Sequence, residues 1–109
     1  MKQKKFTIML TADDALDVTL NFENHQIVKF ALNYRAWINE QWCEVYRVDN
    51  YHGFLHENRM WQDRKAIPIK DKESWRLEIV VDYYVDEINL NFPRYKLLFE
   101  EELKKKSKE

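Results

Sequence analysis

The chain has 109 residues, of which 18 are basic and 19 are acidic, so its formal net charge is −1. Two independent hydrophobic cores would each be too small at this length, and we therefore expect one domain over residues 1–109. A charge so close to zero argues against binding of nucleic acid or an anionic membrane by the whole surface, so any site for a polyanion must be a local patch.

Alternating hydrophobicity predicts strands through the first half of the chain. A short apolar run at 6–11 is followed by strict alternation at 16–22 and by a long alternating segment at 27–38. Another strand is expected at 42–49. A last one at 66–69 would lie at an edge, where a proline is tolerated because an edge strand can spare a hydrogen-bond donor. These segments predict an antiparallel meander of four or five strands.

The strand at 42–49 is expected to present two mixed faces. Strict alternation would place Trp42 and Tyr46 on one face, and Arg47 and Asp49 on the other. Arg47 and Asp49 would then leave the sheet on the same side, immediately before a polar segment of the chain.

The pattern changes to helical spacing after residue 74. Ser74 is expected to be the N-cap, and Glu78 places negative charge near the start of the helix, where the dipole favours it. Apolar residues then recur every three or four positions as far as Leu103. Pro93 interrupts this stripe without changing its phase, which predicts one kinked helix or two helices packed on one face of the sheet. The class is therefore α+β, with 103–109 as a charged, frayed tail.

The segment 47–58, RVDNYHGFLHEN, is where we expect chemistry. It holds two of the three histidines and the only glycine, which permits a sharp turn that brings His52 and His56 toward one point. Two imidazoles can act as base and acid in a phosphodiester transfer. Arg47 can neutralise charge on a phosphorane, and Asp49 can orient an imidazole. These four residues predict a metal-independent ribonuclease that uses the 2′-hydroxyl of its substrate as nucleophile.

Two other interpretations of this segment are open. Asp49, His52 and His56 supply oxygen and nitrogen donors that suit zinc or manganese, which would make the protein a metal-dependent hydrolase. Alternatively, the histidines bond backbone carbonyls while Asp49 and Asn50 simply make the turn. The spacing matches no strong metal motif, and no cofactor is expected.

Basic and aromatic side chains around this segment predict a surface for single-stranded RNA. Between residues 29 and 70, seven basic and five acidic residues give a local net charge of +2. Because unpaired bases stack on aromatic rings, the expected substrate-binding residues are Arg35, Tyr51, Arg59 and Trp61.

Partners other than RNA follow from the helix and from the composition. The helical stripe is wider than one sheet face requires, which predicts a homodimer or another protein partner, and with it a non-catalytic binding or regulatory module. Cys43 is the single cysteine and cannot form an internal disulfide, which favours a reducing compartment. No segment is typical of a signal peptide or of a membrane span. We therefore expect a cytoplasmic protein without membrane contact.

Residues 47–50, followed by His52, Gly53 and His56, form an R-x-D-N…HG-x-x-H pattern. The pattern resembles one in small uncharacterised prokaryotic proteins and is similar in layout to the TumE-type toxins of toxin–antitoxin pairs, which carry an R-Y-D-N segment followed by clustered histidines. The resemblance covers roughly residues 28–56, and only the loop is distinctive. It implies a toxin-like, RNA-cleaving component that is neutralised by a helix-turn-helix antitoxin. TumE-like proteins have a denser histidine cluster than the two histidines found in this loop.

Overall fold

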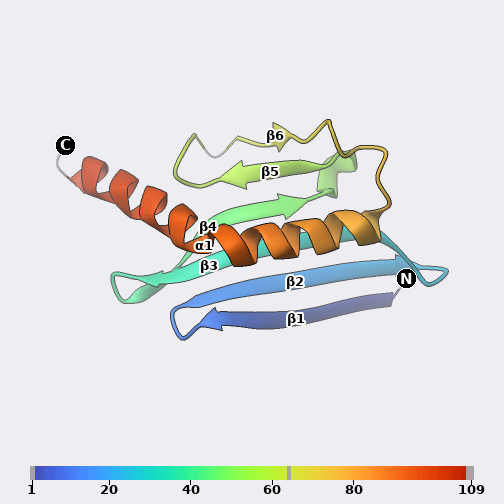
Figure 1. Ribbon diagram of the computed structural model, residues 1–109, viewed down its shortest axis with the longest axis horizontal. Coiled ribbons are helices and arrows are strands. Elements are labelled where there is room, and N and C mark those ends of the chain that lie inside the picture. Colours follow the sequence, from blue (N-terminus) through green and yellow to red (C-terminus); the bar gives the residue numbers. More distant parts are fainter. Residues whose placement is uncertain (1, 64, 108–109) are drawn as a thin grey trace.

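The computed structural model describes residues 2–63 and 65–107. Within these residues it consists of one antiparallel sheet and one long helix (Figure 1). This confirms the predicted α+β class, whereas the predicted number of strands was too low. The elements in chain order are β1 (Lys2–Thr11), β2 (Asp14–Glu23), β3 (Gln26–Ile38), β4 (Gln41–Asp49), the 3₁₀ helix η1 (Tyr51–Gly53), β5 (His56–Arg59), β6 (Ile67–Pro68) and α1 (Leu77–Ser107).

The six strands lie in the sheet in the same order as in the sequence, from β1 to β6. Two-residue turns join β2 to β3 and β3 to β4, and all four turn residues have positive φ: Asn24, His25, Asn39 and Glu40. Consecutive positive φ values define the type I′ turn, whose twist matches that of the flanking strands. Asparagine comes first in both turns because it tolerates the left-handed region better than most residues.

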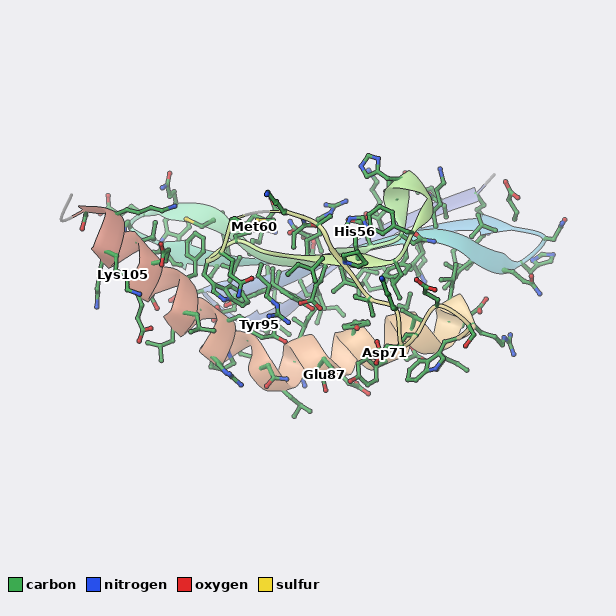
Figure 2. The ribbon with its side chains drawn as sticks, turned by 90° about the horizontal axis from the view of Figure 1, so that it is seen from above. His56, Met60, Asp71, Glu87, Tyr95 and Lys105 are labelled. Atoms are coloured by element: carbon green, nitrogen blue, oxygen red, sulfur yellow. The ribbon has the colours of Figure 1, made fainter. Side chains whose placement is uncertain are left out.

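The helix lies along one face of the sheet, over β3 and β4, and the hydrophobic core fills the space between them (Figure 2). Phe30, Leu32 and Tyr34 alternate along β3 and are completely buried there, as is Ile88 on the helix. No helix of the described residues covers the opposite side of the sheet, which we call the helix-free face. On β3 this face carries Lys29, Ala31, Asn33, Arg35 and Trp37.

The helix is continuous from Leu77 to Ser107 with Pro93 inside it, and it changes direction about midway (Figure 2). Of the two predicted alternatives, the single kinked helix is therefore observed. Ser74 does not cap it, because the first helical N–H groups bond to the carbonyl of Arg76. Residues 103–107, for which a frayed tail was predicted, belong to this helix, while 108 and 109 lie outside the described residues.

Two details of the sheet differ from the prediction. The strand β5 was missed because its sequence, His-Glu-Asn-Arg, is polar on both faces. In β4, Val45 has no partner on β3 and forms a bulge, so strict alternation fails there. Trp42 therefore lies beside Trp37 on the helix-free face, where Arg47 also lies, and not on the face of Tyr46.

In the described part of the chain, no helix is long and apolar enough to cross a membrane.

Candidate functional site

The carboxylate of Asp49, at the end of β4, is the centre of a polar network on the helix-free face. Its Oδ2 lies 2.6 Å from Nε of Arg47, and its Oδ1 accepts a hydrogen bond of 2.9 Å from the backbone N–H of Tyr51. Oδ1 also lies 3.2 Å from Nε2 of His56, the residue directly opposite on β5. Asp49 is only 2% exposed. Its two oxygens are therefore fully engaged in fixing the chain where β4 ends and η1 begins.

His56 is buried beside Asp49, and both of its ring nitrogens face oxygen atoms. Nδ1 lies 3.1 Å from the carbonyl oxygen of Phe54, and Nε2 faces the Asp49 carboxylate. A carbonyl oxygen can only accept, so Nδ1 must carry a proton. With Nδ1 beside the Phe54 carbonyl and Nε2 facing the Asp49 carboxylate, the ring links β5, the preceding loop and β4.

His52, unlike the buried His56, is accessible to solvent. It lies in η1 with a φ of 69°, and its side chain is exposed to solvent. Its ring centroid is 6.3 Å from that of His56. The structure thus brings together the four predicted catalytic residues, but only His52 and the partly exposed Arg47 reach solvent.

The predicted metal-ligand set does not converge in this geometry. Asp49 and His56 face each other, while the His52 side chain is exposed and its ring centroid lies 6.3 Å from that of His56. Across residues 2–63 and 65–107, no three His, Cys, Asp or Glu side chains are grouped as a metal site requires. The side-chain geometry therefore fits the structural interpretation of this segment better than the metal interpretation.

Asn50 completes the R-x-D-N segment with a further structural task. Its Oδ1 accepts a hydrogen bond of 2.9 Å from the N–H of Phe30, and its Nδ2 donates one of 3.1 Å to the carbonyl of Val28. The amide side chain thus continues the pairing of β3 after the backbone of β4 has turned away. Arg47, Asp49 and Asn50, the polar residues of the R-x-D-N segment, thus each have a structural partner here.

Beyond the Asp49 network, the helix-free face carries aromatic rings paired with cations. The guanidinium carbon of Arg35 lies 4.5 Å from the ring centroid of Trp42, and Nζ of Lys29 lies 5.7 Å from that of Tyr51. Trp37 packs edge-on against Trp42, and both indoles are about 40% exposed. The predicted binding residues Arg35 and Tyr51 therefore lie on one face. Lys29, Trp37 and Trp42 were missed as binding candidates, although the alternation of 27–38 already groups the first two with Arg35.

Asp17 anchors the same face from β2. Its carboxylate accepts hydrogen bonds of 2.8 Å from Nε of Arg35 and 2.7 Å from the hydroxyl of Thr7. Partial burial raises the pKa of Asp17, but the hydrogen bonds from Arg35 and Thr7 and the charge of Arg35 outweigh it and hold that pKa below 3.8. Beside Asp17 on the neighbouring strand, Oδ1 of Asn33 is buried without a hydrogen-bond partner, the one such side-chain atom in the described residues.

The other two predicted binding residues, Arg59 and Trp61, lie on the opposite side of the sheet. They line a cavity of about 530 Å³ between α1 and the strands β4 and β5, which we call the helix–sheet cleft. The predicted substrate-binding set is thus divided between two surfaces. The cleft is lined by Tyr46, Glu57, Arg59, Trp61, Gln62, Tyr83, Tyr84, Glu87, Asn91, Arg94, Tyr95 and Leu98.

Fold and site together define a small α+β protein, an antiparallel meander with one face covered by a helix and the other polar and open. A family model described as a domain of unknown function, DUF7718, matches residues 1–105. The chain belongs to this family. Searches of curated proteins and of solved structures find no match.

Proposed function

We propose that this protein binds single-stranded RNA on the helix-free face of its sheet. The observation that carries the proposal is the pairing of cations with half-exposed aromatic rings on that face: Arg35 with Trp42, and Lys29 with Tyr51. Unpaired bases stack on such rings irrespective of sequence, while neighbouring cations contact the phosphates. A sheet face that only contacts solvent would not require the two tryptophans, nor an arginine stacked on one of them.

The arrangement of charge supports a strand that runs across this face. Arg47, next to the Asp49 network, has a partly exposed side chain, and its Nε alone is held by Asp49. The remaining nitrogens of its guanidinium can contact a phosphate, because a guanidinium carries five N–H donors. Trp42 on β4 and Tyr51 in η1 would then stack bases on either side of this contact.

The test is the affinity for a fluorescently labelled single-stranded RNA, measured by anisotropy at low salt for the native chain and for Trp42→Ala. Loss of one stacking partner should weaken binding by about tenfold. The matched control is Trp75→Ala, because Trp75 has nearly the same exposure, 39% against 40%, but precedes the helix. Equal losses in both variants, or absence of binding by the native chain, would refute the proposal.

A second candidate function is cleavage of the bound RNA, as the resemblance to TumE-type toxins implies. The exposed His52 favours it, because its ring centroid lies 6.3 Å from that of the buried His56, which faces the Asp49 carboxylate that also holds Arg47. In this proposal His52 takes the proton of the 2′-hydroxyl, whose oxygen then attacks the adjacent phosphorus. The bond from phosphorus to the 5′-oxygen breaks, the leaving 5′-oxygen takes a proton from water, and Arg47 neutralises charge on the phosphorane. His56 and Asp49 position these groups, since their own polar atoms are already engaged.

Cleavage is tested with an end-labelled RNA, comparing the native chain with His52→Gln and His25→Gln. His25 is the matched control, because it is also exposed and also has a positive φ, in the turn between β2 and β3. Loss of cleavage in His52→Gln alone supports the ribonuclease. A toxin would in addition arrest growth on induced expression and lose this effect in the same variant. Intact RNA and normal growth with the native chain leave RNA binding as the function.

Protein partners are proposed for the outer side of the helix, where Ile79, Leu90 and Leu97 are exposed. A second copy of the chain or an antitoxin-like protein would cover these residues. Light scattering coupled to gel filtration distinguishes the two, because a homodimer forms with the purified chain alone. Leu90→Glu should abolish it.

A further inference from the structure

We infer that the helix–sheet cleft is a binding site for a neutral heteroaromatic ring of the nucleobase type, supplied as a free nucleoside. The cleft lies on the side of the sheet opposite to the proposed RNA-binding face, so this inference is independent of that function. Residues from β4, β5, the turn after β5 and the helix all contribute to its walls. Its volume of about 530 Å³ falls within the range of small-molecule sites.

The floor of the cleft is a group of three aromatic rings. Trp61 and Tyr95 are stacked with a centroid distance of 5.4 Å and an interplanar angle of 23°, and Tyr46 lies 4.7 Å from Tyr95. Tyr46 is buried, whereas Trp61 and Tyr95 are half-buried and border the cavity. Tyr95 projects from the helix toward the sheet (Figure 2). A flat ligand can extend this stack, because aromatic rings favour offset-stacked contacts.

The charged residues that line the cleft carry both signs in equal number. Glu57 and Glu87 supply two carboxylates, and Arg59 and Arg94 supply two guanidinium groups. Arg59 forms an ion pair with Glu57 through its Nε, and Asn91 donates to Glu87 at 3.3 Å. Their net charge of zero gives no preference for a cation or an anion. The four side chains do, however, supply hydrogen-bond donors and acceptors side by side.

The tyrosines add donors that stay neutral. Burial raises the pKa of Tyr95, and the nearby carboxylates Glu87 and Glu57 raise it further. Tyr46 is affected in the same way by burial and by Glu57, and its hydroxyl donates to that carboxylate at 3.3 Å. The phenol of Tyr95 therefore remains a hydrogen-bond donor at physiological pH, at the edge of the stacked rings.

These properties together select the class of ligand. A purely apolar ring would remove water from the carboxylates and guanidinium groups that line the cleft without replacing their hydrogen bonds, which is unfavourable. A strongly charged ligand would meet like charge as well as opposite charge. A nucleobase presents a flat face for stacking on Trp61 and Tyr95, together with donors and acceptors along its edge and no net charge.

The experiment is a titration with adenosine, guanosine, cytidine and uridine, followed by NMR of the tryptophan indole N–H signals in the full chain. Binding in the cleft should move the Trp61 signal and leave those of Trp37 and Trp42 in place. Glu87→Gln changes a half-buried carboxylate on the helix surface and should weaken binding about tenfold, as expected for a lost hydrogen bond to a charged group. Trp61→Leu should abolish it, with Trp75→Leu as the matched control, because Trp75 does not line the cleft.

Two outcomes overturn the inference. One is that none of the four nucleosides moves any indole signal at millimolar concentration. The other is that nucleosides move only the signals of Trp37 and Trp42, which places them on the helix-free face and supports the RNA proposal instead. Because Glu87→Gln leaves the aromatic floor intact, it keeps the test decisive if Trp61→Leu fails to fold.

Discussion

Where β4 meets β5, each face of the sheet carries an ion pair between two residues of one strand, and the two ion pairs have different roles. On the helix-free face, Arg47 and Asp49 lie two residues apart on β4 and form an ion pair; on the covered face, Glu57 and Arg59 do so on β5. Both carboxylates are buried, at 2% and 9% exposure. Asp49 is bonded to the backbone and to His56, whereas Glu57 is bonded to the phenol of Tyr46. The first pair thus fixes a turn of the chain, and the second forms the wall of a cleft.

The comparison predicts the largest loss of stability for Asp49→Ala. The change would leave His56 buried without its partner and would free the N–H of Tyr51, so the free energy of unfolding should fall by about 3 kcal/mol or more. Urea denaturation measures this loss. Glu23→Ala, at the exposed end of β2, is the control and should change stability by less than about 0.5 kcal/mol. Similar small effects in both variants would show that the Asp49 network is not structural.

Glu57→Ala should cost less than Asp49→Ala, although it removes the same kind of group. The side chain of Arg59 is 42% exposed and can turn into water once its partner is gone, leaving mainly the Tyr46 hydroxyl unpaired. We expect a loss of about 1 to 3 kcal/mol in the same denaturation experiment. A loss equal to or larger than that of Asp49→Ala would contradict the difference drawn between the two faces.

The two histidines of the loop sharpen the comparison between structural and accessible groups. His56→Ala removes a buried ring with two hydrogen-bonded nitrogens and should destabilise the fold by about 1 to 3 kcal/mol. His52→Ala changes an exposed side chain and should stay within about 0.5 kcal/mol of the native chain. The thermal midpoints of both variants, measured side by side, check this. Equal midpoints would mean that His56 does not hold β4 and β5 together.

The smallest expected effect is the pH dependence due to Asp17. Its folded-state pKa is lowered, chiefly because the bonds from Arg35 and Thr7 outweigh the effect of burial, so its contribution is present above pH 3.8 and is lost as the pH falls through the folded pKa. The native chain should be more stable than Asp17→Asn by up to about 1 kcal/mol at pH 6. This difference should shrink below about pH 4. A difference that grows on acidification would have the wrong sign.

Hydrophobic periodicity was sufficient to predict most of the fold. The alternation at 16–22 and 27–38 located two strands and their buried faces, and the stripe that continues in phase across Pro93 predicted the long helix. The periodic pattern was not sufficient for β5, whose four residues are polar because one face holds the Asp49 network and the other borders the cleft. It also failed at Val45, because a bulge reverses the faces of a strand without any local sequence signal.

The candidate site was predictable in part. The segment 47–58 was singled out as a dense polar cluster, and contacts join its four proposed catalytic residues in the structure. Their roles were not predictable, because the same Arg, Asp and His side chains serve equally well as catalytic groups or as partners of one another. Only the distances from the Asp49 carboxylate to Arg47, Tyr51 and His56 show that these groups are partners of one another. Arg59 on β5 and Trp61 in the turn after it were grouped with residues of the other face because β5 was not recognised.

The consecutive order of the strands has a consequence for how the chain folds. Each strand pairs with its immediate neighbours in the sequence, and tight two-residue turns close two of the hairpins. Pairing between chain neighbours keeps contact order low for a β-rich protein, and such topologies fold faster than sheets that require long-range closure. The helix follows all six strands in the chain and packs on β3 and β4. The central hairpin of β3 and β4 is therefore the expected folding nucleus, to be tested by comparing the folding and unfolding rates of Leu32→Ala and Ile88→Ala.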